Sequence, residues 1–184
     1  MRQRQKIRQR KLRAVRPSKQ AEVYYRKQLD QLVSYMQSIV VEELQRDTLN
    51  DALFSKGVEL LASQMDRILN RLEAMDINNF ATSLARGFVN RMNRNSSDSF
   101  NSNLKNSIGV DMNKIVSPPE IGDALNVAIA QNTALIKSIK DEYKEKVSKL
   151  IRDNVLNGER PSNIVTQIKD IGGVTTKTTS PNLS

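Results

Sequence analysis

Residues 21–46 read AEVYYRKQLDQLVSYMQSIVVEELQR, and apolar side chains recur in this stretch at every third or fourth position. The recurring positions are Tyr25, Leu29, Leu32, Met36, Ile39, Val40 and Leu44. This spacing places them on one face of an α-helix that is about 39 Å long at 1.5 Å per residue. Because such a face has to be buried against other helices, the stretch predicts a helical bundle.

The same periodicity continues along most of the chain. It predicts further helices at about 51–75, 77–93, 120–139, 141–157 and 161–171. No stretch alternates with a period of two for long enough to form a strand. We therefore predict an all-α fold, a helical bundle with long helices, in which residues 20–172 form the body.

Short signals predict where the helices begin and end. Asp76 can cap the start of the helix at 77–93, and Gly158 is well placed to end the helix at 141–157. The polar stretch NRNSSDSFNSN, residues 93–103, is interpreted as a loop, with a short helical piece from Phe100 to Ile108. Residues 47–51 are interpreted as a break between the first two helices.

Charge is distributed unevenly along the 184 residues. The chain has 29 basic and 20 acidic residues, and the first 19 residues contain nine bases and no acid. These bases are Arg2, Arg4, Lys6, Arg8, Arg10, Lys11, Arg13, Arg16 and Lys19. Without them the chain has 20 residues of each sign, so the net charge of +9 belongs to this arm.

A basic arm on a neutral body is typical of a tether to a polyanion. Arg and Gln alternate in it with few apolar residues, so we expect the arm, residues 1–19, to be disordered when free. Three interpretations of the arm stay open: it binds nucleic acid, it binds an acidic protein, or it binds no partner and only keeps the protein soluble. Only Tyr24 and Tyr25 could stack on nucleobases near the arm. DNA binding by the nine basic residues would therefore be independent of the DNA sequence.

The chain offers little for catalysis. It has no Cys and no His, and it contains none of the common nucleotide-binding, metalloprotease or hydrolase motifs. The carboxylate pairs Glu42-Glu43 and Asp141-Glu142 are interpreted as solvated helix faces. We therefore expect no enzyme, no cofactor and no metal site, and no apolar run is long enough to span a membrane.

Two other polar features have weaker interpretations. Asp111-Met112-Asn113 begins like a calcium loop but lacks its Gly and Glu, so it is interpreted as a loop or a cap. Arg86, Arg91 and Arg94 form either a second basic stripe on the third helix or a solvated face. The stretch VTTKTTSPNLS at residues 174–184 is small and polar, and we interpret residues 173–184 as a tail.

Residues 120–172 carry a family resemblance. An Asn precedes a Leu-Ile-x-x-Ile helix, followed by a helix with Tyr and Val, a Gly stop and a short helix that ends in Ile-Gly. These features are Asn132, Leu135, Ile136, Ile139, Tyr143, Val147, Ile151, Gly158, Ile164, Ile168 and Gly172. In this order they resemble the head-morphogenesis (Mu F-like) minor head proteins of tailed phages.

The resemblance implies a structural protein of the virion, held in the capsid interior after assembly in the host cytoplasm. It implies docking on the portal or another head protein, contact with double-stranded DNA through the arm, and help in head assembly or DNA delivery. Self-association is a further possibility, and no membrane partner is implied. The alternatives are a helical nucleic-acid-binding or scaffolding protein with no virion role, and an enzyme fragment whose active part follows residue 184.

Overall fold

The structure is a computed structural model that describes residues 18–46, 57–108, 118–158 and 163–171. Its helices are α1 (Lys19–Arg46), α2 (Gly57–Glu73), α3 (Ile77–Ile108), α4 (Pro118–Leu156) and a short helix at residues 163–171. These described residues contain no strand, so the all-α prediction is confirmed. The expected disorder of the arm, the break at 47–51, the segment 111–113 and the tail concern residues outside the described ranges.

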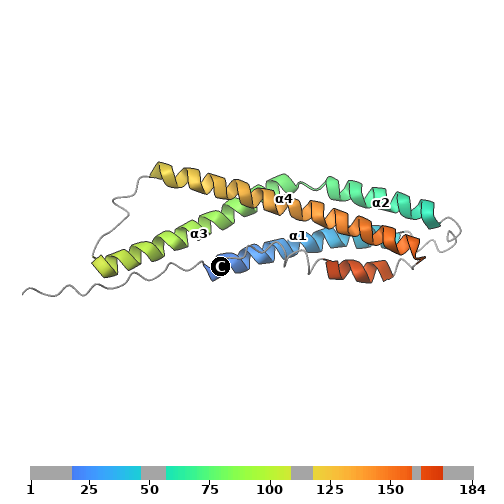
Figure 1. Cartoon of the computed structure of the whole chain (residues 1–184), viewed down its shortest axis with the longest axis horizontal. Coiled ribbons are helices and arrows are strands. Elements are labelled where there is room, and N and C mark those ends of the chain that lie inside the picture. The colour runs from blue at the N-terminus through green and yellow to red at the C-terminus, as the bar shows by residue number, and fades with distance from the viewer. Residues whose placement is uncertain (1–17, 47–56, 109–117, 159–162, 172–184) are drawn as a thin grey trace, which may run out of the picture.

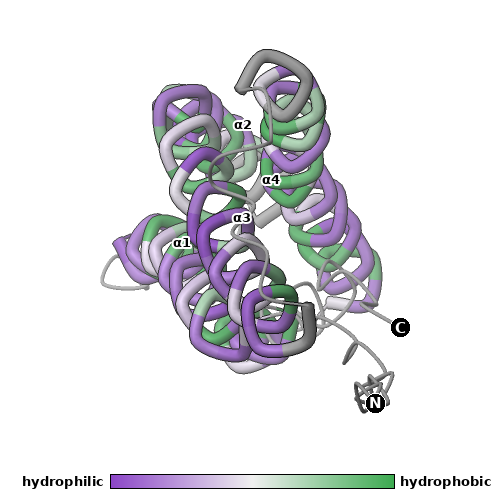
Figure 2. The backbone as a smooth tube through the Cα atoms, turned by 90° about the vertical axis from the view of Figure 1, so that its left-hand side faces the viewer, coloured by the Kyte–Doolittle hydropathy of each residue, from purple (hydrophilic) through white to green (hydrophobic). Residues whose placement is uncertain are grey.

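The helices form an elongated bundle. α2 and α3 follow one another along its length, α4 crosses beside both of them, and α1 lies below (Figure 1). The view along the long axis shows the helices grouped around a shared interior (Figure 2). The core within this interior receives buried side chains from all five helices, among them Met36, Leu72, Ala81, Tyr143 and Ile168.

The apolar face predicted for α1 is confirmed. All seven of its positions from Tyr25 to Leu44 are buried, and none has more than 5% of its surface exposed. The start of this helix is set by Ser18, whose Oγ accepts a hydrogen bond from the backbone N–H of Ala21 at 3.3 Å. Lys19 is therefore the first residue of α1, and its assignment to the disordered arm was wrong.

The two predicted helix ends at Asp76 and Gly158 are confirmed. The Oδ1 atom of Asp76 accepts a hydrogen bond from the backbone N–H of Asn79 at 3.2 Å, as an N-cap residue does. Gly158 has a φ of 67°, the left-handed conformation that commonly follows the last turn of a helix. Both signals act over a single turn, which is why the sequence alone reveals them.

The loop predicted at residues 93–103 is wrong, because α3 continues through it to Ile108. Asn and Ser are weak helix formers, but no Gly or Pro interrupts this stretch, so the propensity cost is small at each position. α3 packs more extensively on α4 than on any other helix, and Leu104 beyond the stretch is buried. No residue of 93–103 is itself buried, so the helix continues through this stretch because nothing in it stops a helix before the buried Leu104.

The predicted boundary near residue 140 is also wrong. α4 is one helix of 39 residues, and it runs through both of the expected helices. Nothing at Lys140-Asp141 breaks a helix, and Ile139, Lys140 and Tyr143 are all buried where the boundary was expected. Continuous burial across this point favours one long helix.

The short helix at residues 163–171 packs on both α1 and α4. Its Ile164 and Ile168 are fully buried, as the spacing predicted. The side-chain amide of Gln37 on α1 donates to the carbonyl of Ile168 at 3.2 Å and to that of Lys169 at 3.0 Å. Since carbonyls in the last turn of a helix lack helical partners, Gln37 caps this helix from 131 residues away.

Candidate nucleic-acid interface and a buried glutamate cluster

Eight of the nine predicted DNA-binding residues, Arg2 to Arg16, lie outside the described residues. The ninth, Lys19, is exposed in the first turn of α1. The structure therefore defines the surface from which the arm departs, and that surface is formed by α1 and α3.

α1 and α3 pack side by side in opposite directions. The rings of Tyr25 and Phe88 lie 4.4 Å apart between their centroids, and the Arg91 guanidinium lies 3.6 Å from the centroid of the Tyr24 ring. Further along α1, Leu32 lines the same hollow as Ile77. Residue numbers thus rise on α1 as they fall on α3, which places the start of α1 beside the part of α3 that follows Arg91.

The Arg91–Tyr24 contact is a cation–π interaction at the arm's point of departure. An exposed contact of this kind contributes about 0.5–1 kcal/mol. Arg91 itself is exposed, as are Arg86 and Arg94, and α3 has no acidic residue between Asp76 and Asp98. The three arginines of the possible second basic stripe are thus exposed. Arg91 contacts Tyr24, which lies near the start of α1.

The interpretation of Glu42-Glu43 as a solvated pair is wrong for Glu43. Its side chain is only 2% exposed, whereas that of Glu42 is 64% exposed. Glu43 continues the apolar face of α1, because it lies four residues after Ile39 and three after Val40. This spacing from Ile39 and Val40 was the sequence signal that Glu43 is buried, but the interpretation as a solvated carboxylate pair overlooked it.

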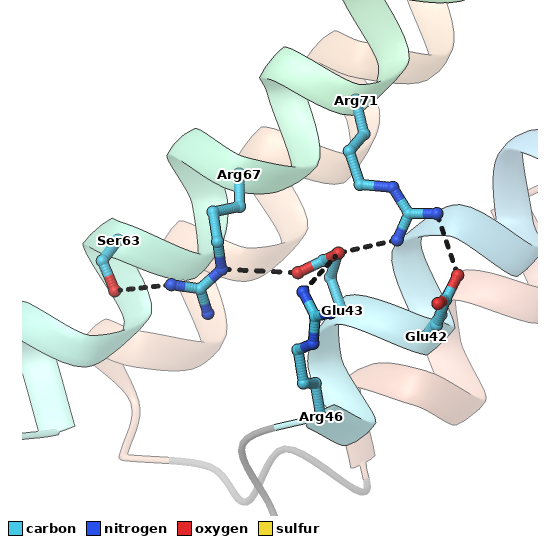
Figure 3. A network of polar contacts seen from close by, with 6 residues as sticks. All are labelled: Glu42, Glu43, Arg46, Ser63, Arg67 and Arg71. Atoms are coloured by element: carbon cyan, nitrogen blue, oxygen red, sulfur yellow. Dashed lines mark hydrogen bonds and ion pairs between the residues drawn. The ribbon is translucent and has the colours of Figure 1, made fainter.

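Three arginines surround the Glu43 carboxylate (Figure 3). Arg71 Nη1 lies 2.6 Å from Oε1, Arg67 Nε lies 3.3 Å from Oε2, and Arg46 Nη1 lies 3.6 Å from Oε1. Arg71 also binds Glu42 at 2.9 Å through Nη2. Arg67 and Arg71 are four residues apart on α2, so one face of that helix presents both to α1.

Opposing effects act on the ionisation of Glu43. Burial raises the pKa of its carboxyl, but the hydrogen bonds from Arg71 and Arg67 and the charge of Arg46 lower it. The net pKa lies below the ordinary value of 4.5, so the carboxylate stays ionised at neutral pH. The cluster is thus a charged link between α1 and α2, whose arginines remain 39–66% exposed.

The other carboxylate pair agrees with its interpretation. Asp141 is exposed, and Glu142 pairs with Lys146 at 3.9 Å on the surface of α4. A different carboxylate, Glu73 at the end of α2, binds Lys144 at 2.5 Å and Lys140 at 3.4 Å. The hydrogen bond from Lys144 is the main cause that lowers the pKa of Glu73.

Two buried tyrosines belong to the core. Within the described residues, neither the Tyr25 nor the Tyr143 hydroxyl has a hydrogen-bond partner. Burial raises the pKa of Tyr25 to about 12 and that of Tyr143 further, so both phenols are neutral and neither can act as a base at neutral pH.

The described part of the chain offers no metal site and no membrane span. In it, no three acidic side chains converge as metal ligands would. No described helix is long and apolar enough to cross a bilayer.

The chain is similar in sequence to a bacterial protein. An uncharacterized protein of Haemophilus influenzae is 33% identical to this chain over 179 residues, which cover 94% of the chain and 39% of the relative. The chain thus spans about two fifths of the length of that protein. No model of a protein family matches the chain, and no solved structure matches it.

Proposed function

We propose that this chain is a structural minor head protein of a tailed bacteriophage. Its helical body docks on the portal or on another protein of the inner head. Its basic arm contacts packaged double-stranded DNA without reading the sequence, and the protein aids head assembly or DNA delivery. It belongs to the capsid interior and passes through the host cytoplasm during assembly.

The observation that carries DNA contact is the separation of charge. Residues 1–19 contain nine basic residues and no acidic one, while the remaining 165 residues have a formal net charge of zero. Clustered Arg and Lys bind the phosphate backbone by releasing its counterions, and this binding needs no base contact. A neutral body leaves the arm as the main electrostatic attachment.

The virion role rests on the resemblance of residues 120–172 to the Mu F-like minor head proteins. Most of the positions that carry it pack in the core, including Ile136, Tyr143, Val147 and Ile151 on α4. Ile164 and Ile168 belong to the short helix that Gln37 caps. This supports the docking body as one folded unit in which the family-like segment supplies α4 and the short helix.

DNA contact is tested by deleting residues 2–16, which removes eight bases and keeps Ser18 to cap α1. The full chain should bind a mixed-sequence duplex with a log–log salt slope of about −7 for eight phosphate contacts. The deletion should abolish most of that slope and leave the helical circular dichroism unchanged. A matched variant with every arm Arg changed to Lys should keep the slope, and unchanged binding by the deleted chain would refute the proposal.

The virion role is tested by quantitative mass spectrometry of purified particles from the source, before and after DNA release. A few copies of the chain per head are expected. Absence from particles, combined with salt-sensitive DNA binding, would favour the second candidate, a helical nucleic-acid-binding or scaffolding protein with no virion role. The separated charge favours that candidate equally, because it does not depend on the family resemblance.

A further inference from the structure

We propose that DNA bound by the arm also lies on the folded body, against a patch formed by Lys27 of α1 and Arg91 and Arg94 of α3. This body patch would hold the phosphate backbone of a duplex. The inference rests on the proposed DNA contact of the arm and extends it to residues of the helical bundle.

The antiparallel packing of α1 and α3 places the patch beside the arm. Tyr24, which meets Arg91, follows Ser18 by six residues, or about 9 Å of helix. Arg94 lies about one turn beyond Arg91, on the side toward Ser18. Lys27 is one turn after Tyr24 on the same side of α1. A duplex held by the arm would therefore pass over these three residues.

The charges of the patch are available for a ligand. All three side chains are exposed, and within the described residues neither Lys27 nor Arg94 forms an ion pair or a side-chain hydrogen bond. Arg91 stacks on Tyr24, and a guanidinium that stacks through its face keeps the N–H groups at its edge for an acceptor. Three lysines of α4 differ, because Lys140, Lys144 and Lys146 already pair with carboxylates.

The patch favours phosphate over bases. Arg91 covers one face of the half-buried Tyr24 ring, so a nucleobase cannot stack on that face. Arg also suits the bidentate geometry of a phosphate. A duplex presents only its backbone to such a surface, whereas a single strand gains most from stacking, so we assign double-stranded DNA as the ligand.

The test compares two double variants of the full chain that change charge equally. Lys27→Gln with Arg94→Gln removes two charges from the patch and leaves the Arg91–Tyr24 contact intact. Lys149→Gln with Arg152→Gln removes two exposed charges from the far end of α4. Binding to a mixed-sequence duplex is measured against salt, and circular dichroism checks that both variants fold.

Loss of two phosphate contacts should make the salt slope of the patch variant shallower by about 1.8 and weaken binding at least about tenfold near 0.1 M salt. The α4 variant should match the unmodified chain. Equal losses in both variants would mean that only net charge matters, and no loss in the patch variant would mean that the body does not touch DNA; either result overturns the inference. These results are separate from the arm deletion, whose failure would overturn the proposed function itself.

A footprint supplies an independent readout on the unmodified chain. Both Lys27 and Lys149 are exposed in the free protein, so both should react with an acylating reagent. Bound duplex DNA should slow acylation of Lys27 several-fold, because it covers the body patch, and should leave acylation of Lys149 unchanged. Equal reactivity of Lys27 with and without the duplex would overturn the inference even if the affinity of the patch variant changed.

Discussion

Arg71 Nη1 lies 2.6 Å from Oε1 of Glu43, and this contact joins α2 to α1 at a carboxylate that is almost fully shielded from solvent. A buried carboxylate is tolerated only where donors replace its water. Arg71, Arg67 and Arg46 supply these donors, and each arginine keeps part of its own surface in water. The arrangement helps to fix how α1 and α2 are aligned, because Arg67 and Arg71 reach Glu43 from the other helix.

Replacing Glu43 by Gln should destabilise the fold by about 1–3 kcal/mol, since hydrogen bonds to a charged group would be lost in a buried site. Urea unfolding followed by circular dichroism measures the change. The neighbouring variant Glu42→Gln is the matched control. It should cost less than about 0.5 kcal/mol, because Glu42 is mostly exposed. Equal effects of the two variants would argue against the cluster.

The stability of the protein should fall on acidification. The pKa of Glu43 is lowered in the folded state, so its contribution is present above the unfolded value near 4.5 and is lost as the pH falls through the folded value. The difference in unfolding free energy between the unmodified chain and Glu43→Gln should therefore shrink below about pH 4.5. A difference that stays constant from pH 7 to pH 3 would contradict this.

Ile168→Ala should destabilise the protein by about 2–5 kcal/mol, because its fully buried side chain would leave a cavity between the short helix, α1 and α4. Ile171→Ala, at a half-buried position of the same helix, should cost clearly less. Thermal and urea unfolding measure both variants. Similar small costs would mean that residues 163–171 do not pack as the structure has them.

Ser97→Pro distinguishes the helix from the predicted loop at residues 93–103. In the middle of α3, proline removes a backbone hydrogen bond and clashes with the preceding turn, at a cost of about 3 kcal/mol or more. Ser97→Ala should stabilise the exposed position by up to about 0.5 kcal/mol. A proline variant as stable as the unmodified chain would show that this stretch is not helical in solution.

Prediction from sequence succeeded where the signal is repeated or local. The apolar spacing of α1 located its core face, and Asp76 and Gly158 marked two helix ends within one turn. It failed at residues 93–103, where low helix propensity was taken for a loop although no residue there prevents a helix. It also failed at Glu43, because the sequence does not say which helix brings Arg67 and Arg71 to that carboxylate.

The sequence by itself determined the all-α fold class, the buried face of α1 and the concentration of positive charge in residues 1–19, because each follows from residue types a few positions apart. Tertiary structure alone decided that Glu43 is buried among arginines, that Gln37 caps a helix 131 residues away, and that Arg91 and Arg94 lie beside the arm's point of departure. The physical reason is distance along the chain. Local spacing fixes which side chains share a helix face, but only the packing of whole helices fixes which faces meet.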